Sequence, residues 1–180
     1  MFFCLARPAR DGKGFTLIEL MLVVGIISLI AAIAVPGLMR ARLSANHASA
    51  VGSVRTISGA EAAYSASCGG GGYAIDLADL GLAPLAGGIG FVPPDIAAAF
   101  PGGTPKSGYE FVVTPVAGDV VMPAADTCNG STNDPETEFF ANADPIAPSA
   151  GTRFFGTDQS GQIRQGDATI LDITDGIPLQ

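Results

Sequence analysis

Residues 12–39 read GKGFTLIELMLVVGIISLIAAIAVPGLM, and this stretch decides how the chain is organised. Glu19 is the only ionisable side chain between Lys13 and Arg40, and residues 20–39 are all uncharged. A helix needs about twenty such residues to cross the hydrocarbon core of a bilayer. A carboxylate beside this run is costly in lipid and persists mainly when it has a partner. The stretch therefore predicts a membrane helix whose single acid has a specific role.

The parts of this stretch do not stand in the order of an ordinary secretory signal. In a secretory signal the cleavage site follows the apolar core, so the core is removed with the signal. Here a basic leader, residues 1–14, ends on Gly14, which precedes the apolar core. Cleavage after Gly14 would leave Phe15 as the first residue of a chain that keeps its membrane helix.

These residues resemble the signal of type IV prepilins, which type IV pilins share with the pseudopilins of type II secretion and competence systems. The resemblance rests on the basic leader, the pair Gly14–Phe15, Glu19 as the fifth residue after the cleavage point, and Pro36 as the twenty-second. It covers about the first fifty residues. It implies that a prepilin peptidase cleaves between Gly14 and Phe15 and methylates the new Phe15 amine.

The resemblance also provides a candidate partner for Glu19. The Phe15 amine that cleavage releases stays charged near neutral pH, and methylation keeps that charge. In a filament, Glu19 of one subunit would neutralise the Phe15 amine of a neighbour, and low dielectric would make this pairing strong. The alternative is that Glu19 complements its own helix N-terminus or reaches the membrane interface, which is worth about 0.3 to 1 kcal/mol. We expect the intersubunit role.

The pattern beyond the apolar run predicts one helix over residues 15–67, with residues 15–39 in the membrane. Pro36 deprives the Ala32 carbonyl of its usual donor, so we expect a kink or a locally melted turn there, the alternative being an ordinary helix end. Further along, side chains recur at alternating steps of four and three, which indicates one packed helix face. They are Leu43, His47, Ala50, Val54, Ile57, Glu61 and Tyr64.

The rest of the chain, residues 68–180, predicts a globular head. Four glycines directly after Cys68 end the helix, and a Pro- and Gly-rich linker follows. We expect short helices at 76–80 and 95–99, then strands at 109–113, 120–122, 139–143, 153–157 and 162–165, the first two joined as a hairpin by a turn at 117–119. This order predicts an α+β, pilin-like fold in which the long helix lies across one face of an antiparallel sheet.

Three cysteines are present, and two of them fall in the head. Cys4 lies in the leader, whereas Cys68 and Cys128 belong to one domain. In an oxidising compartment a disulfide is their expected use, so we predict a Cys68–Cys128 bond. Two separate buried thiols are the alternative.

The head is strongly acidic, because from Cys68 onward three basic residues stand against fourteen acidic ones. Such a surface repels phosphates, so direct nucleic-acid binding is not expected. We interpret the oxygen-rich loop at residues 126–138 as a solvated acidic loop rather than a calcium site, because the EF-hand glycine and its spaced glutamate are missing. We expect no metal, no cofactor and no enzymatic activity, since the near-matches to nucleotide motifs at 69–74 and 102–107 fail in context and the head holds no histidine.

The resemblance implies a structural subunit that polymerises with copies of itself into a type IV pilus, which then serves adhesion, motility or DNA uptake. The implied partners are the prepilin peptidase, the membrane, and an inner-membrane assembly platform with its ATPase motor. Before assembly the subunit would cross the inner membrane once, N-terminus cytoplasmic, and after assembly it would lie in an extracellular filament. The alternatives are a pseudopilin of a secretion or competence system and, in another class, a membrane-anchored binding protein.

Overall fold

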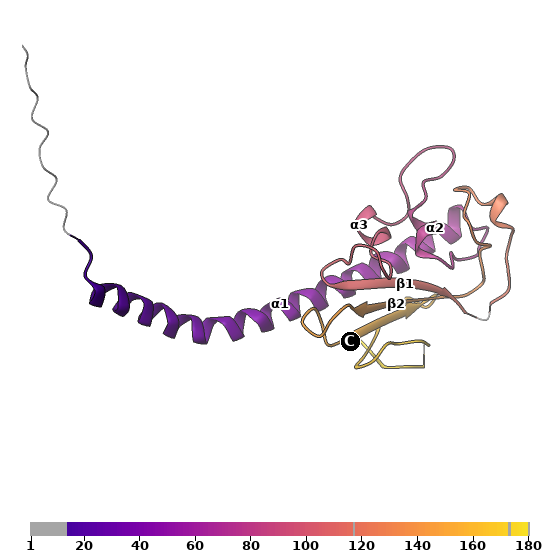
Figure 1. Ribbon diagram of the computed structural model, residues 1–180. Coiled ribbons are helices and arrows are strands. Elements are labelled where there is room, and N and C mark those ends of the chain that lie inside the picture. Colours follow the sequence, from indigo (N-terminus) through magenta and orange to yellow (C-terminus); the bar gives the residue numbers. More distant parts are fainter. Residues whose placement is uncertain (1–13, 117, 173, 180) are drawn as a thin grey trace, which may run out of the picture. The chain divides into compact units, whose positions relative to one another are not determined.

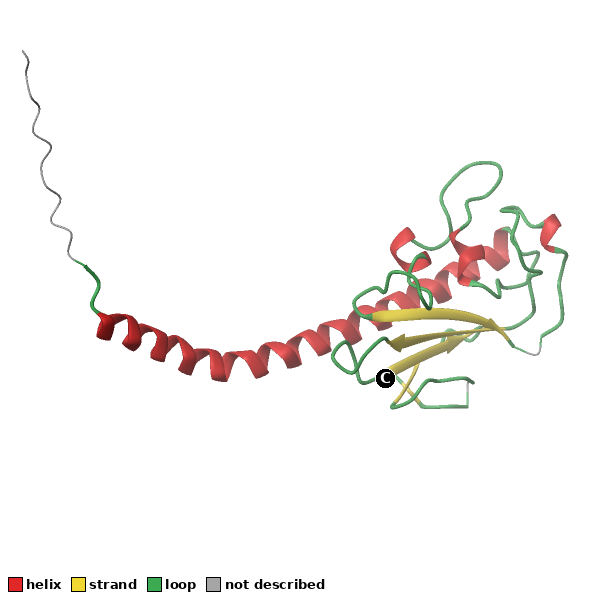
Figure 2. Cartoon of the chain, viewed as in Figure 1, coloured by secondary structure: helices red, strands yellow, loops and turns green. Residues whose placement is uncertain are grey.

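The computed structural model describes residues 14–116, 118–172 and 174–179 (Figure 1). Its first element is one long helix, α1 (Leu17–Ser67), and a region of short helices and strands follows it (Figure 2). The chain divides into two compact units, Met1–Arg40 and Ala41–Gln180, so their boundary falls inside α1. Of the expected leader, only Gly14 lies within the described residues. The predicted single long helix is confirmed.

The second unit is built on a five-stranded antiparallel sheet. In sheet order the strands are β1 (Tyr109–Pro115), β2 (Phe139–Pro145), β3 (Phe154–Asp158), β4 (Arg164–Gly166) and β5 (Ile177–Pro178). Each strand pairs with the next one along the chain, so the sheet is a meander. The predicted fold class, a long apolar helix followed by an antiparallel sheet in a pilin-like α+β arrangement, is confirmed.

The predicted hairpin between residues 109–113 and 120–122 is wrong. β1 pairs with β2 in a register that places Tyr109 opposite Pro145, and Val120 forms only an isolated bridge to Glu136. The first five residues of β2 are all buried. A strand buried in this way lies inside a sheet, with a neighbouring strand on each side. The neighbours of β2 are β1 and β3, so β1 pairs with β2 rather than with residues 120–122.

Smaller elements complete the second unit. α2 (Leu77–Gly81) and α3 (Pro94–Ala97) lie close to the two short helices that the sequence predicted. α2 begins at an Asp76 cap, whose carboxylate accepts the N–H of Ala78 at 2.9 Å. The 3-10 turn η1 (Ala124–Asp126) and strand β5 were not predicted.

The second half of α1 supplies one wall of the core. Ala50, Val54, Ile57 and Tyr64 are fully buried and share one hydrophobic cluster with Phe111 of β1 and other sheet residues. The predicted face is therefore correct from residue 50 onward, whereas Leu43 and His47 are only partly buried. Burial of this face attaches the helix to the sheet through the hydrophobic effect.

Glu61 is a carboxylic acid on this buried face. Its side chain is 0% exposed. Oε2 accepts the N–H of Ala74 at 2.9 Å, and Oε1 has no hydrogen-bond partner among the described residues. Burial raises the pKa of Glu61 to about 8, the Ala74 N–H opposes this rise, and the charge of Asp79 adds to it. Glu61 is therefore mostly protonated at neutral pH.

We predict that Glu61→Gln stabilises the head and removes part of its pH dependence. The folded state holds the Glu61 proton more tightly than the unfolded state does, whose pKa is near the ordinary 4.5. The free energy of unfolding therefore falls as pH rises from about 4.5 to about 8. Urea unfolding of the full chain in detergent should show a gain for the glutamine variant that grows over this range to a few kcal/mol.

Asp167→Asn is the matched control for this experiment, because Asp167 is exposed. The control should change stability little at any pH. A glutamine variant that keeps the wild-type slope between pH 4.5 and 8 would show that Glu61 does not titrate as its burial requires.

Candidate assembly and processing site

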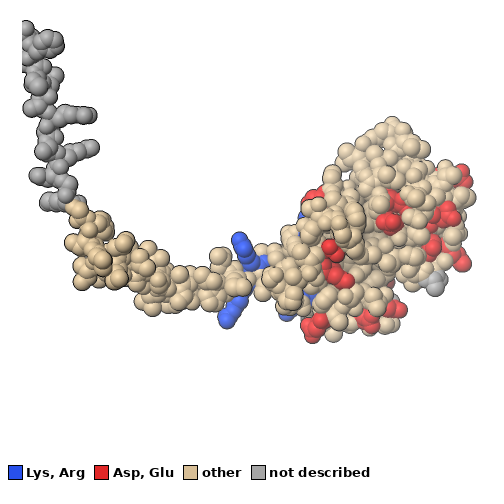
Figure 3. Space-filling view, in the orientation of Figure 1, with Lys and Arg blue, Asp and Glu red and all other residues tan. Residues whose placement is uncertain are grey.

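The first half of α1 is apolar and, within its own compact unit, exposed along its described residues. Within the described residues, α1 is the one helix long and apolar enough to cross a membrane, and its most apolar window has a mean hydropathy of 2.7 with no buried residue. Every large apolar side chain from Phe15 to Met39 is exposed, the least exposed being Val23 at 42%. Figure 3 shows an unbroken uncharged surface along the visible face of this stretch. Such a surface requires lipid or other helices around it.

The helix begins at a cap that the sequence reasoning missed. Thr16 Oγ1 accepts the N–H of Glu19 at 3.3 Å, and the Thr16 carbonyl accepts the N–H of Leu20 at 3.2 Å. Thr16 is thus the N-cap, and Glu19 is the third helical residue. A threonine followed three residues later by a glutamate is the capping-box spacing. The sequence of residues 16–19 therefore predicts Thr16 as the N-cap.

Among the residues that the structure describes, the Glu19 carboxylate has no hydrogen-bond or ion-pair partner at this helix start. A complete capping box would have this carboxylate accept the N–H of Thr16, but only the bond from the Glu19 N–H to Thr16 is made. Among the described residues the ion pair is Lys106–Asp95, so Glu19 has no charged partner there. The local helix terminus therefore leaves the carboxylate available to a group from outside the chain.

The bond between Gly14 and Phe15 lies in an exposed segment just before α1. Residues 14–16 have no regular secondary structure, and Phe15 is 75% exposed. A Cβ added at Gly14 would meet no atom within 4 Å. Among the described residues, packing therefore leaves room for a side chain at position 14.

The structure shows neither a locally melted turn nor a helix end at Pro36, and the kink expected as the other possibility stays a prediction. α1 is helical without a break from Leu17 to Ser67, with Pro36 inside it. Proline removes one hydrogen bond, but the bonds of the flanking turns remain. Nearby, Ser28 donates its hydroxyl to the Val24 carbonyl at 2.8 Å, and a Cβ at Gly25 would meet open space. Small residues on this uncovered surface permit close approach of another helix.

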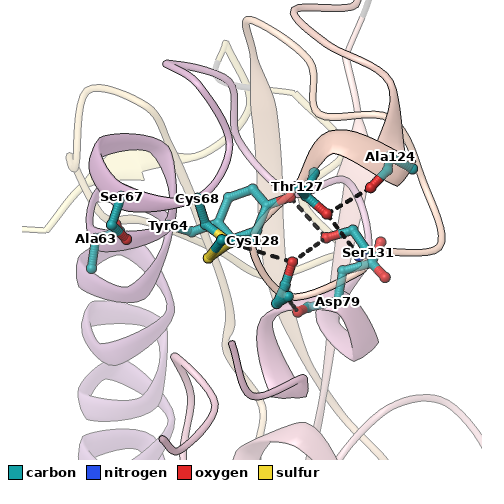
Figure 4. The surroundings of a disulfide bond; sticks show 10 residues. Ala63, Tyr64, Ser67, Cys68, Asp79, Ala124, Thr127, Cys128 and Ser131 are labelled. Atoms are coloured by element: carbon teal, nitrogen blue, oxygen red, sulfur yellow. Dashed lines mark hydrogen bonds between the residues drawn. A yellow bond between two sulfur atoms is a disulfide. The ribbon is translucent and has the colours of Figure 1, made fainter. Parts of the chain in front are cut away.

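The other end of α1 carries the predicted disulfide, which is confirmed. Cys68 directly follows the last residue of α1 and is bonded to Cys128, with a Cα–Cα distance of 4.8 Å and a sequence separation of 60 residues (Figure 4). The Cys68 N–H donates to the Tyr64 carbonyl at 2.8 Å. The bond therefore attaches the loop around Cys128 to the end of the helix.

A buried polar network lies beside the disulfide. The hydroxyls of Tyr64 and Ser131 are 2.8 Å apart, and Ser131 donates its hydroxyl to Asn129 Oδ1 at 2.9 Å (Figure 4). Asn129 Nδ2 donates to the Asp79 carbonyl at 2.8 Å. The Asp79 carboxylate accepts the backbone N–H groups of residues 132 and 133. These bonds fold the loop onto α1 and α2.

The interpretation of residues 126–138 as a solvated acidic loop is therefore only partly right. Asp126 and Asp134 are exposed, but Thr127, Asn129 and Ser131 are buried and hydrogen-bonded inside the head. Within the described part of the chain, no group of three or more His, Cys, Asp or Glu side chains is placed to hold a metal ion. Of the residues that suggested a calcium loop, Asn129 and Ser131 take part in the internal hydrogen bonds of the head.

The order of these features along the chain is that of a pilin-type subunit. An exposed glycine–phenylalanine bond comes first, then a membrane-capable helix with a carboxylate in its first turn, and then an acidic α+β head. Residues 10–35 match the family model of the prokaryotic N-terminal methylation motif. Over 37 residues the chain is 54% identical to the type IV wide pilus major component PilA4 of Thermus thermophilus. The aligned residues make up 21% of this chain and 28% of that protein. No solved structure matches the chain.

These findings confirm the resemblance to the type IV pilin family, which they place in the N-terminal segment. The chain aligns with little more than a quarter of its curated relative's length. The methylation motif at residues 10–35 and the apolar helix that overlaps it support a subunit of the pilin or pseudopilin type that is anchored in a membrane. This family is a structural one and not an enzyme family.

We predict that loss of the disulfide destabilises the head by roughly 4 kcal/mol, because the bond closes a loop of about sixty residues in the unfolded chain. The double variant Cys68→Ala/Cys128→Ala should lower the urea midpoint, and reduction of the wild-type chain should lower it to a similar extent. An unchanged midpoint in both experiments, or alkylation of both residues in unreduced protein, would rule out a structural disulfide.

Proposed function

We propose that this chain is a structural subunit of a type IV pilus and that it polymerises through the first half of α1. The observation that carries this proposal is the apolar surface from Phe15 to Met39, whose large side chains are exposed and which holds one acid, Glu19. A monomer can cover this surface with lipid. Other copies of the same helix can cover it equally well, and the small residues among them favour close packing.

Processing converts the membrane-inserted chain into a subunit ready for assembly. A prepilin peptidase cuts between Gly14 and Phe15, and the new Phe15 amine is methylated without losing its charge. In the filament this amine of one subunit meets the Glu19 carboxylate of a neighbour. Two charges that are costly alone in low dielectric then satisfy one another.

The proposed topology rests on the basic residues of the leader, Arg7, Arg10 and Lys13. The basic leader keeps the N-terminus in the cytoplasm, in keeping with the positive-inside rule. The head then lies on the side of the inner membrane that faces away from the cytoplasm. An oxidising compartment there suits the Cys68–Cys128 bond. The remaining partners are an inner-membrane assembly platform and its ATPase motor, which would extract subunits into the growing filament.

A pseudopilin function rests on the same N-terminal signal and differs in the filament that results. The curated relative is the major component of a pilus, which favours the pilus. Shearing cells and probing the supernatant for this chain distinguishes the two, because a pilus subunit is released in surface filaments and a pseudopilin stays with the envelope.

We predict that the mature protein begins at N-methylated Phe15 and that Gly14→Val blocks processing, because a branched side chain at the scissile residue obstructs the enzyme without disturbing the fold. Intact-mass spectrometry measures both outcomes. Gly37→Ala is the matched control, because it too adds side-chain atoms in open space but lies far along the chain from the scissile bond. Assembled material that still starts at Met1 would refute the proposed processing.

We predict that Glu19→Val preserves membrane insertion, processing and head folding but lowers filament yield by roughly tenfold or more, because a neighbour's amine would enter low dielectric unpaired. Glu19→Gln should fail nearly as badly, since an amide supplies no charge. Ser28→Ala, which alters another polar side chain of the stretch and removes no charge, should assemble normally. Filament yield is measured against the membrane pool of processed subunit, and wild-type yield from the valine variant would return Glu19 to a role at its own helix terminus.

A further inference from the structure

The only histidine in the chain, His47, joins α1 to the segment between β2 and β3. Its Nε2 accepts the backbone N–H of Thr152 at 3.2 Å. The neighbouring Asn46 donates Nδ2–H to the Ala150 carbonyl at 2.8 Å, so two adjacent helix residues hold this segment. Among the described residues these two side-chain bonds join the segment at residues 146–153 to the helix, while its two ends are held from the sheet side, by the Ile146 N–H on the Gly108 carbonyl at 3.0 Å and the Tyr109 phenol on the Arg153 carbonyl at 2.8 Å.

The His47 ring also lies edge-on to two aromatic side chains of the sheet. Its centroid is 6.4 Å from that of Tyr109 at an interplanar angle of 82°, and 6.2 Å from that of Phe155 at 69°. Edge-to-face contacts of this kind fix the ring's orientation. The imidazole is therefore held with Nε2 directed at the Thr152 N–H.

The bond to Thr152 requires the neutral form of His47. A neutral imidazole has one nitrogen that accepts, whereas both nitrogens of the imidazolium carry protons and can only donate. The Thr152 bond assigns the neutral form with its proton on Nδ1. Protonation at Nε2 would place one donor against another and abolish the bond.

The charged and titratable groups around His47 favour the neutral form. Arg153, on the attached segment, carries a positive charge. Tyr109, on β1, donates its phenol O–H to the Arg153 carbonyl at 2.8 Å. Burial raises the pKa of Tyr109 to about 12, so Tyr109 stays uncharged. Phe155, on β3, is apolar, and the α1 residues one turn away, Leu43 and Ala50, carry no charge. Burial first, and the Arg153 charge second, lower the pKa of His47.

We propose that His47 is an acid-sensitive latch, which holds residues 146–153 against α1 when neutral and releases this segment when it takes up a proton from the solvent. The proton binds the Nε2 lone pair, the Thr152 N–H loses its acceptor, and the new imidazolium lies near Arg153. The fully buried core formed by Val54, Ile57 and Phe111 does not include this segment, so the release is local.

The linkage has a definite sign. The folded chain holds the His47 proton less tightly than the unfolded chain, whose imidazole titrates near 6.5. The contribution of neutral His47 to the free energy of unfolding is therefore fully present above pH 6.5. It is lost as the pH falls through the folded-state pKa, which lies below that value. A head that faces an acidic medium would lose the latch before it loses its core.

Amide hydrogen exchange tests the latch on the full chain in detergent micelles, with rates corrected for the intrinsic effect of pH. In wild type, peptides covering residues 146–153 should gain exchange several-fold as the pH falls from 7.5 to 4.5, while β3 stays protected. NMR titration of the His47 ring should give a midpoint below 6.5. The gain in exchange should follow this midpoint.

Two variants separate the latch from a general loosening. His47→Gln offers an acceptor that does not titrate, so the acid-dependent gain should vanish, whatever the level of protection at pH 7.5. Asn46→Ala removes the neighbouring bond and should raise exchange at every pH while keeping the acid-dependent gain. The proposal is overturned if the glutamine variant keeps the gain, or if the segment stays protected after the ring has been protonated.

Discussion

The constraint on which the rest of this molecule depends is the exposed apolar surface along the first half of α1. From Phe15 to Met39 the large side chains are exposed, so this part of α1 is unstable in water and needs lipid or other helices. The free carboxylate of Glu19 adds a second requirement, because in that apolar surrounding it needs a positive charge. In the function we propose, a neighbouring copy whose chain begins at Phe15 would meet both requirements at once.

The same helix meets the opposite requirement in its second half, where it must remain attached to a folded head. A buried face from Ala50 to Tyr64, the Cys68–Cys128 bond and the polar network around Asp79 attach it to the sheet and its loops. Glu61 in the core and His47 at its margin belong to this interface, and burial shifts the pKa of each toward its neutral form. The helix is thus held to the head by contacts that depend on protonation as well as on apolar burial.

The sequence predicted the features that local patterns specify. The apolar run, the steps of four and three, and the glycines after Cys68 defined α1 almost to the residue. The pairing of β1 with β2 could not be read in the same way, because residues 120–122 have an equally plausible strand pattern and only the burial of β2 on both faces decides the partner. The inward direction of Asn129 and Ser131 depends on Tyr64 and Asp79, which are distant in sequence, and no local pattern reports such contacts.

A helical reconstruction of sheared filaments, at a resolution that shows side chains, tests the central claim most directly. Polymerisation through the first half of α1 requires that residues 17–39 of many copies form the filament core. It also requires the Phe15 nitrogen of one subunit to lie within hydrogen-bonding distance, about 3 Å, of the Glu19 carboxylate of another. Filaments whose core excludes this helix, or whose Glu19 meets only the Thr16 cap of its own chain, would contradict it.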